Sequence, residues 1–446
     1  MKGEIEMNHE KFWGEQTDLA IEHFDIGDEK MPSEIITAFA YIKKCAAIAN
    51  AKLGKLDKRK RDVICEAADA VLSGELEDQF PLHVWQTGSG TGTNMNVNEV
   101  LAGYGNDIAG ENLLHPNDDV NMSQSSNDTF PSAMHIAAVL GISNKLLPEM
   151  QALAETFKAL EAENAAVIKI GRTHLQDATP IRFSQELSGW RSMLEKCAAM
   201  LQDAIEHLRA LAEGGTAVGT GINCPEGFRE VFLEELNKEL GESFKAPDNS
   251  FHAMTARDEL VFAHGALKAL ASDMMKIAND VRFLASGPRC GYGEITIPFN
   301  EKGSSIMPGK VNPTQCEQVT MIAVQVMAND TAIAFANSQG NFELNVYAPV
   351  IAHNFLQSVN LLSDSIHCFH EYCVKGIKAN ADKMRENLQK SLMLVTALNP
   401  AIGYDMAGSV AKEAFESGKT LKEVCLERGL MSEETFDELT NPEKLV

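Results

Sequence analysis

The chain has 446 residues, of which 44% are hydrophobic, and its formal net charge at pH 7 is -24. This length allows two or three domains around at least one large core. The acidic balance argues against nucleic acid and anionic membrane as partners, because both carry negative charge themselves.

Cysteine usage and hydropathy indicate a reducing compartment. The nine cysteines are an odd number without the close pairing of a zinc site, so we expect reduced thiols and no bound metal. The first ten residues lack the apolar stretch of a signal peptide and are too acidic for a transit peptide. No apolar run is expected to reach the length that crosses a membrane. We therefore predict a cytoplasmic protein.

Helical periodicity dominates the chain, and strand patterns are weak. Apolar residues recur every three or four positions after Ser33, and Gly54 is placed to end this first helix. Asp57 begins a second helix that runs towards Leu72. The longer helices that follow are predicted over 150–160, 187–208, 252–284, 315–336 and 350–374. Stripes that keep their phase over several turns are typical of a helical bundle.

The fold prediction is an all-α chain with a central bundle of long helices. Asn399, Pro400 and Gly403 break the helical pattern, and shorter, more charged helices follow them. Apolar surface on the long helices is expected to be covered by other subunits. The predicted domains are an N-terminal mostly helical domain at 1–122, a central helical bundle at 123–381 and a small C-terminal helical domain at 382–446.

Four polar clusters share one design, because each precedes a predicted helix. They lie at 87–94, 123–128, 171–180 and 303–317. One such cluster is most simply a helix cap or a surface loop, since Ser, Thr, Asn and Asp are the residues with which helices begin. Four clusters with more hydroxyls and amides than capping needs indicate several helix starts converging on one anion.

The fourth cluster offers a base and a counter-charge. Ser304 and Ser305 are ordinary hydroxyls unless backbone N–H groups of the Gly-rich turn favour the deprotonated form of one of them. Lys310 can pair with a substrate carboxylate or be a solvated loop lysine. Asn312 is the predicted N-cap of the next helix.

Two further residues are candidates for proton transfer. His174 lies in the third polar cluster, although a lone histidine is more often structural. Glu317 is predicted about one turn inside its helix, where it can orient an imidazole or simply complement the helix dipole. The chain contains no nucleophile elbow, no phosphate loop and no dinucleotide fingerprint, which argues against hydrolases and nucleotide enzymes.

The segment Gly-Ser-Ser-Ile-Met-Pro-Gly-Lys-Val-Asn-Pro at 303–313 resembles the signature of the fumarase/aspartase superfamily. The following Thr-Gln-Cys-Glu resembles the class II fumarate hydratase family in particular. Further matching motifs occur in the same order over nearly the whole chain, among them Trp-Gln-Thr-Gly-Ser-Gly-Thr at 85–91, Ser-Gln-Ser-Ser-Asn-Asp at 123–128, Gly-Arg-Thr-His-Leu at 171–175 and Asn-Phe-Glu-Leu-Asn-Val at 341–346.

The resemblance implies reversible, stereospecific anti addition of water to fumarate to give L-malate, with no metal or organic cofactor. It also implies a three-domain, all-α fold and a homotetramer whose active sites are shared between subunits. By matching motif, Ser304 is implied as the catalytic base and His174 as the acid/base partner with Glu317 behind it. The implied substrate-binding residues are Ser89, Thr91, Ser125, Ser126, Asn127, Thr173, Ser305, Lys310 and Asn312.

The resemblance implies a second dicarboxylate site at His115, Asn117 and Asp118. The family has an arginine three residues before this histidine, and the present chain has Asn112 there. An ordinary Pro-Asn-Asp turn is therefore an adequate alternative.

Two rival functions remain open at this point. An aspartate ammonia-lyase shares the elimination chemistry, but Ser126, Gly309 and the Phe342-Glu343 pair favour the hydratase. An inactive structural relative is the other possibility. Such a relative would be expected to have lost loop or acid/base residues, all of which this chain retains.

Overall fold

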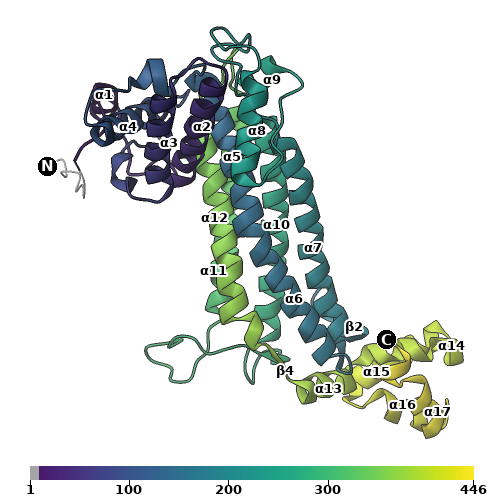
Figure 1. Cartoon of the computed structure of the whole chain (residues 1–446). Helices are drawn as coiled ribbons and strands as arrows, with labels where there is room; N and C mark the ends of the chain where they lie inside the picture. The colour runs from purple at the N-terminus through teal and green to yellow at the C-terminus, as the bar shows by residue number, and fades with distance from the viewer. Residues whose placement is uncertain (1–9) are drawn as a thin grey trace. The chain divides into compact units, whose positions relative to one another are not determined.

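The computed structural model describes residues 10–446, so the first nine residues, part of the basis for the predicted location, lie outside it. Figure 1 shows a chain built almost entirely of helices, which confirms the all-α prediction. Up to the third cluster the α-helices are α1 (Glu15–His23), α2 (Ser33–Lys52), α3 (Lys58–Leu72), α4 (Thr91–Ala109), α5 (Ser126–Gly141) and α6 (Leu147–Glu163). The following helices are α7 (Phe183–Leu208), α8 (Phe228–Leu240), α9 (Ser250–Thr255), α10 (Asp258–Leu284), α11 (Thr314–Asn337) and α12 (Ala348–Tyr372). The C-terminal helices are α13 (Ala381–Lys390), α14 (Asn399–Ile402), α15 (Tyr404–Ser417), α16 (Leu421–Glu427) and α17 (Glu433–Leu439).

The chain divides into two compact units. Unit 1 comprises Met1–Pro148, Cys197–Ala271 and Ile322–Ser363, and unit 2 comprises Glu149–Lys196, Ser272–Met321 and Asp364–Val446. The divisions at 196/197, 271/272, 321/322 and 363/364 fall inside α7, α10, α11 and α12. The boundaries of the three predicted domains stay a prediction.

Unit 1 is organised around α2, which packs against α3, α5 and α8. Phe39 of α2 and Phe130 of α5 are both fully buried, with ring centroids 5.8 Å apart in an edge-to-face arrangement. The predicted start of α3 is confirmed, because the Asp57 side chain accepts hydrogen bonds from the N–H groups of Arg59 and Lys60. Such an N-cap satisfies donors that the first helical turn leaves unpaired.

The single helix predicted over 252–284 is wrong, since the chain forms α9 and then α10 with a break between them. Ala256 is extended, with φ -85° and ψ 156°. The buried Arg257 guanidinium donates to the carbonyl oxygens of Ala253 at 3.1 Å and Met254 at 3.0 Å. These bonds satisfy carbonyl groups at the end of α9, where a continuous helix would have used backbone N–H groups.

Unit 2 contains two small two-stranded sheets. Strand β1 (Ile168–Thr173) pairs antiparallel with β2 (Gln176–Arg182), and β3 (Ile295–Thr296) pairs with β4 (Lys378–Ala379). The third polar cluster was expected to be a loop before a helix, and it is instead most of this hairpin. The polar side chains concealed the strand pattern, because much of β2 is solvent-exposed.

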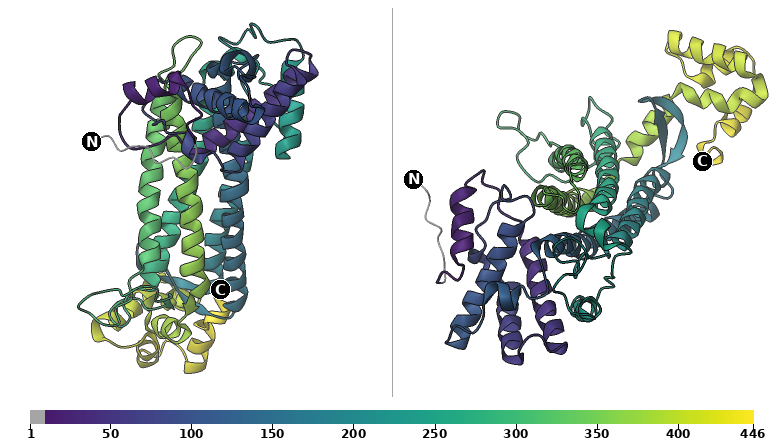
Figure 2. Two further views of the ribbon diagram at one scale, coloured as in Figure 1. Left: turned by 60° about the vertical axis from the view of Figure 1, so that its left-hand side comes forward. Right: turned by 90° about the horizontal axis from the view of Figure 1, so that it is seen from above.

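The C-terminal segment has a hydrophobic core of its own within unit 2. Its buried residues are Val395, Leu398, Ala407, Val410, Ala414, Leu421, Val424, Cys425 and Phe436. Figure 2 shows these C-terminal helices, coloured yellow, grouped together. α15 contacts α16, and α16 contacts α17.

Helix α11 exposes much of its apolar surface in the single chain. Met321, Val324 and Phe335 are 67%, 60% and 69% exposed. An 18-residue window of this helix has a mean hydropathy of 1.4, so by length and composition α11 could cross a membrane. The expectation that no apolar run reaches this length is therefore wrong. Only 33% of that window is buried within the chain.

Candidate active site

Two of the four polar clusters meet in unit 1 at the first turns of α4 and α5. The Thr91 hydroxyl lies 2.8 Å from the Ser89 hydroxyl and 2.7 Å from the Ser126 hydroxyl. All three side chains are partly exposed, so these three linked hydroxyl groups are accessible to a ligand. These two clusters therefore lie together, as the prediction requires, and their binding of one anion stays a prediction.

The start of α5 is held by a reciprocal cap. The Ser125 hydroxyl accepts from the N–H of Asn127 at 3.3 Å, and the Ser125 N–H donates to the Asp128 carboxylate at 2.9 Å. The Asn127 amide donates to the Ala217 carbonyl oxygen at 2.8 Å. These bonds fix the segment that presents Ser126 at the positive end of the helix dipole, which favours an anion.

Asp128 also ties this helix start to a loop far along the chain. Its second carboxylate oxygen accepts from the N–H groups of Gly214 at 3.1 Å and Thr216 at 2.7 Å. Burial raises the pKa of Asp128 to about 7, against the opposing effect of its backbone hydrogen bonds. Burial, together with the charge of Asp128, likewise raises the pKa of Glu213. In residues 10–446 neither Glu213 carboxylate oxygen has a hydrogen-bond partner.

Lys43 is the cation of this buried group. It is 0% exposed, and its Nζ donates to Asn94 at 2.8 Å, Asn121 at 2.9 Å and Gln124 at 3.1 Å. Burial lowers the pKa of Lys43 to about 7, although nearby carboxylates oppose the shift. Its amide partners lie on α4 and just before α5, so Lys43 holds together the two segments that carry the hydroxyls.

Gly90 allows the close approach of these two segments. It has φ 77°, and a Cβ built on it would lie 2.1 Å from the ring of Phe130 in α5. We expect Gly90→Ala to destabilise the fold by about 3 kcal/mol, from left-handed strain and overpacking together. Gly54→Ala is the matched control, because Gly54 has φ 70° and open space around its Cβ position. Thermal unfolding should show a larger loss for Gly90→Ala, and equal losses would contradict the steric argument.

In unit 2, His174 occupies the turn of the β1–β2 hairpin. His174 and Leu175 have φ 56° and 60°, and Thr173 pairs with Gln176 on either side of them. Two successive left-handed residues are typical of a type I′ turn, which normally favours Asn and Gly. The turn exposes the side chains of Thr173 and His174 to solvent. Backbone strain of this kind is concentrated at functional sites.

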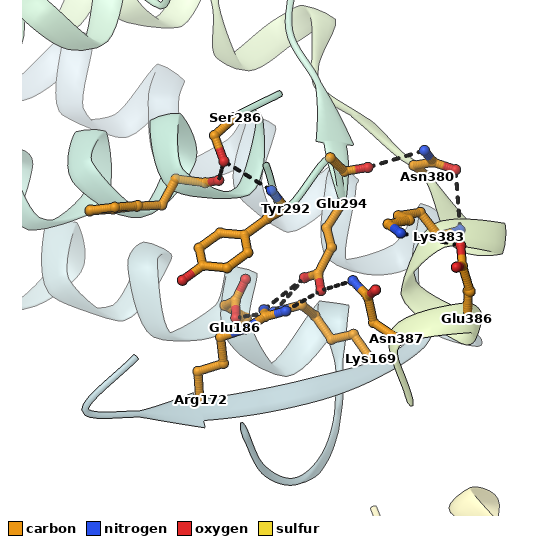
Figure 3. A network of polar contacts seen from close by, with 12 residues as sticks. Lys169, Arg172, Glu186, Ser286, Tyr292, Glu294, Asn380, Lys383, Glu386 and Asn387 are labelled. Atoms are coloured by element: carbon orange, nitrogen blue, oxygen red, sulfur yellow. Dashed lines mark hydrogen bonds and ion pairs between the residues drawn. The ribbon is translucent and has the colours of Figure 1, made fainter. Parts of the chain in front are cut away.

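A polar network lies at the base of this hairpin (Figure 3). The Arg172 guanidinium donates to both carboxylate oxygens of Glu294, at 2.6 and 3.1 Å, and stacks over the Tyr292 ring at 4.5 Å. Asn387 of α13 donates to the same carboxylate at 3.0 Å, and the Lys169 ammonium lies 3.3 Å from it. Burial alone would raise the pKa of Glu294, but these donors and charges outweigh it and lower that pKa.

The fourth cluster forms a loop whose ends are tied together in unit 2. The Asn312 amide donates to the Gly303 carbonyl oxygen at 2.5 Å. α11 begins at Thr314, so the prediction that Asn312 caps it is wrong, because its side chain closes the loop instead. Within the loop, the Ser304 hydroxyl accepts from the N–H groups of Ile306 at 3.3 Å and Met307 at 3.1 Å. Two such donors stabilise negative charge on this oxygen.

The remaining predicted residues of this cluster point to solvent. Ser305 and Lys310 are exposed, and Lys310 forms no ion pair within the described chain. Glu317 is exposed in the first turn of α11. Over residues 10–446 no hydrogen bond or ion pair joins His174 to Glu317. The described chain therefore shows no direct link between these two predicted residues.

The residues of the predicted second dicarboxylate site form a local turn. His115 precedes a short π-helix (Pro116–Val120), and its Nδ1 accepts from the Asp118 N–H at 3.1 Å. Asn112 and Asn117 are exposed. Two neighbouring cations are already paired with acids, since Lys60 binds Asp119 and Arg59 binds Glu111. The turn accounts for His115 and Asp118, and the second site stays a prediction.

One group of side chains in the described chain has the spacing of metal ligands. It consists of His252, Asp258 and Glu259 at the ends of α9 and α10. His252 Nε2 lies 3.0 Å from Asp258, and both side chains are about half exposed. An exposed ion pair of this kind is common on surfaces and gives no reason to assign a metal.

Sequence reasoning missed the buried residues behind the candidate site. Lys43 and Glu213 lie in helical or loop segments without a polar motif, and Glu294 follows an ordinary Gly-rich stretch. Only Asp128 carried a signal, since it closes the second polar cluster three residues after Ser125, in the spacing of a capping box.

Comparisons with known proteins agree over the full chain. The family model described as "Lyase" matches residues 3–328, and that described as "Fumarase C C-terminus" matches residues 394–446. A protein from Helicobacter pylori named fumarate hydratase class II is 56% identical over 100% of this chain and 97% of that relative. A protein of the same name from Oceanobacillus iheyensis is 58% identical over 99% of this chain and 97% of that relative. The crystal structure of class II fumarase from Schistosoma mansoni superposes with a TM-score of 0.96 at 41% identity, covering 98% of this chain and 96% of that one. The chain therefore belongs to the class II fumarate hydratase family of lyases.

Proposed function

We propose that this protein catalyses the reversible hydration of fumarate to L-malate by anti addition of water. The observation that carries the proposal is the Ser304 turn, in which two backbone N–H groups face the hydroxyl that must hold negative charge. The full-length similarity to relatives named fumarate hydratase class II supports the choice of substrate.

In the malate-to-fumarate direction, Ser304 removes the C3 proton. This step places a second negative charge on the adjacent carboxylate and gives an aci-carboxylate intermediate. The enzyme must therefore present donors where that charge develops. Lys310, the hydroxyls of Ser89, Thr91 and Ser126, and the start of α5 supply such donors. They explain how a chain of net charge -24 can bind a dianion.

His174 is the proposed acid that protonates the departing hydroxyl group, oriented by Glu317. Ser125, Asn127, Thr173, Ser305 and Asn312 complete the proposed contacts to carboxylate and water. Closure of the loop 303–312 over the substrate would exclude water. Gly309 is the proposed hinge, because it has φ 80° and no atom within 4 Å of its Cβ position.

A homotetramer with shared active sites accounts for two features of the single chain. In residues 10–446 no hydrogen bond or ion pair joins His174 to Glu317, and α11 leaves an apolar face uncovered. Other copies of the chain would supply the neighbours of His174 and Glu317 and would cover the apolar face of α11. We also propose the three domains at 1–122, 123–381 and 382–446. A cytoplasmic location fits the nine free cysteines.

We expect purified protein to consume fumarate in a buffer without ammonium. Loss of the ultraviolet absorbance of fumarate measures the reaction, and L-malate should appear in equal amount. The same assay with added ammonium is the control, because an aspartate ammonia-lyase needs ammonia as its second substrate. Dependence on ammonium would overturn the hydratase assignment, and inactivity under both conditions would favour a structural relative.

A further inference from the structure

Glu294 is anchored by both its backbone and its side chain. Its N–H donates to the Leu284 carbonyl oxygen at the end of α10 at 2.9 Å, and its own carbonyl accepts from the Asn380 N–H at 2.8 Å. Asn380 caps α13, and it also donates its side-chain amide to the Gly293 carbonyl oxygen. The carboxylate thus projects from a segment fixed to two helices.

The carboxylate of Glu294 forms ion pairs with two side chains of β1, just before the hairpin turn. Lys169 and Arg172 are three residues apart and would face opposite sides of a regular strand. The β1–β2 register shifts between Ile170 and Arg172, and this irregularity allows both cations to reach one carboxylate. Glu294 is 0% exposed, so the ion pairs are shielded from solvent.

Arg172 connects the Glu294 carboxylate to the hairpin turn. It is two residues before His174, and the fork of its guanidinium is fixed by both Glu294 oxygens and by the Tyr292 ring (Figure 3). The turn itself holds two non-glycine residues in the left-handed region, a conformation that persists only when its surroundings impose it.

We propose that Glu294 is a positioning residue for the reaction, acting through Arg172 to hold the hairpin turn that presents His174. Nothing in this role requires Glu294 to touch the substrate. The inference rests on the proposed acid role of His174. It adds that the placement of this acid/base group depends on a buried ion pair at the base of its hairpin.

A double-mutant cycle tests this role in the full-length protein. Glu294→Gln keeps the size of the side chain but removes the charge that holds Arg172. We expect kcat to fall by about 10- to 100-fold with a much smaller change in KM, because small misplacements of a catalytic group cost about that much. In a His174→Asn background the same substitution should lower the residual rate by less than about twofold.

Glu161→Gln is the matched control, because Glu161 also binds an arginine, Arg191, at 2.7 Å between helices of unit 2. It should leave kcat nearly unchanged. Equal effects of Glu294→Gln in both backgrounds, or none in either, would overturn the positioning role. Near-normal activity of His174→Asn alone would instead refute the proposed acid.

Arg172→Lys covers the case in which Glu294→Gln does not fold. It keeps the positive charge and loses the bidentate fork, so we expect a loss of kcat and the same lack of effect in the His174→Asn background. An additive loss in this second cycle would also overturn the proposal.

Discussion

Ser304→Ala is expected to lower kcat by about 10³-fold or more, equivalent to about 4 kcal/mol of transition-state stabilisation. The substitution removes the oxygen that two backbone N–H groups face. KM should change much less, since the substitution leaves the proposed carboxylate contacts of Lys310, Ser89, Thr91 and Ser126 in place. Initial rates in both directions of the reaction measure the effect.

Ser417→Ala is the control for this experiment. Ser417 is an exposed serine at the end of α15 whose hydroxyl donates to the Glu413 carbonyl oxygen. It tests whether loss of any serine hydroxyl alters the protein. Both variants should elute as the same oligomer as the unmodified chain. Near-normal turnover by Ser304→Ala would remove this residue from the mechanism.

Local patterns in the sequence predicted the helices well. α2, α6 and α7 were expected from apolar periodicity, and α11 and α12 from runs rich in Ala, Leu and Met, which are both properties of neighbouring residues. The break before α10 was not predicted, because it depends on Arg257 folding back onto the carbonyl groups of α9. The hairpin of β1 and β2 was also missed, since its exposed polar strand resembles a loop.

The candidate site was predictable where its residues lie at helix starts. The contact between Thr91 and Ser126 was expected, because both residues belong to polar clusters that precede helices. The buried ion pair of Arg172 and Glu294 joins residues 122 positions apart, and nothing local to either residue marks the contact. Buried charges are retained only with partners, but the sequence does not identify which partner each one has.

His174→Asn is expected to lower kcat by about 10²- to 10⁴-fold, the range typical of a lost general acid or base. Asparagine tolerates the left-handed conformation that residue 174 adopts, so the turn should survive the exchange. The loss then reports on proton transfer and not on folding.

The pH dependence distinguishes this role from simple substrate binding. If one acid and one base both act, kcat/KM follows a bell-shaped curve, and His174→Asn should abolish one of its two limbs. His23→Asn is the control, because His23 is exposed in the last turn of α1 and should leave the curve unchanged. A bell of unaltered shape in His174→Asn, with only a higher KM, would mean that the imidazole binds substrate without exchanging a proton. In that case the acid must be sought among the groups that other copies of the chain would bring to the turn in the proposed tetramer.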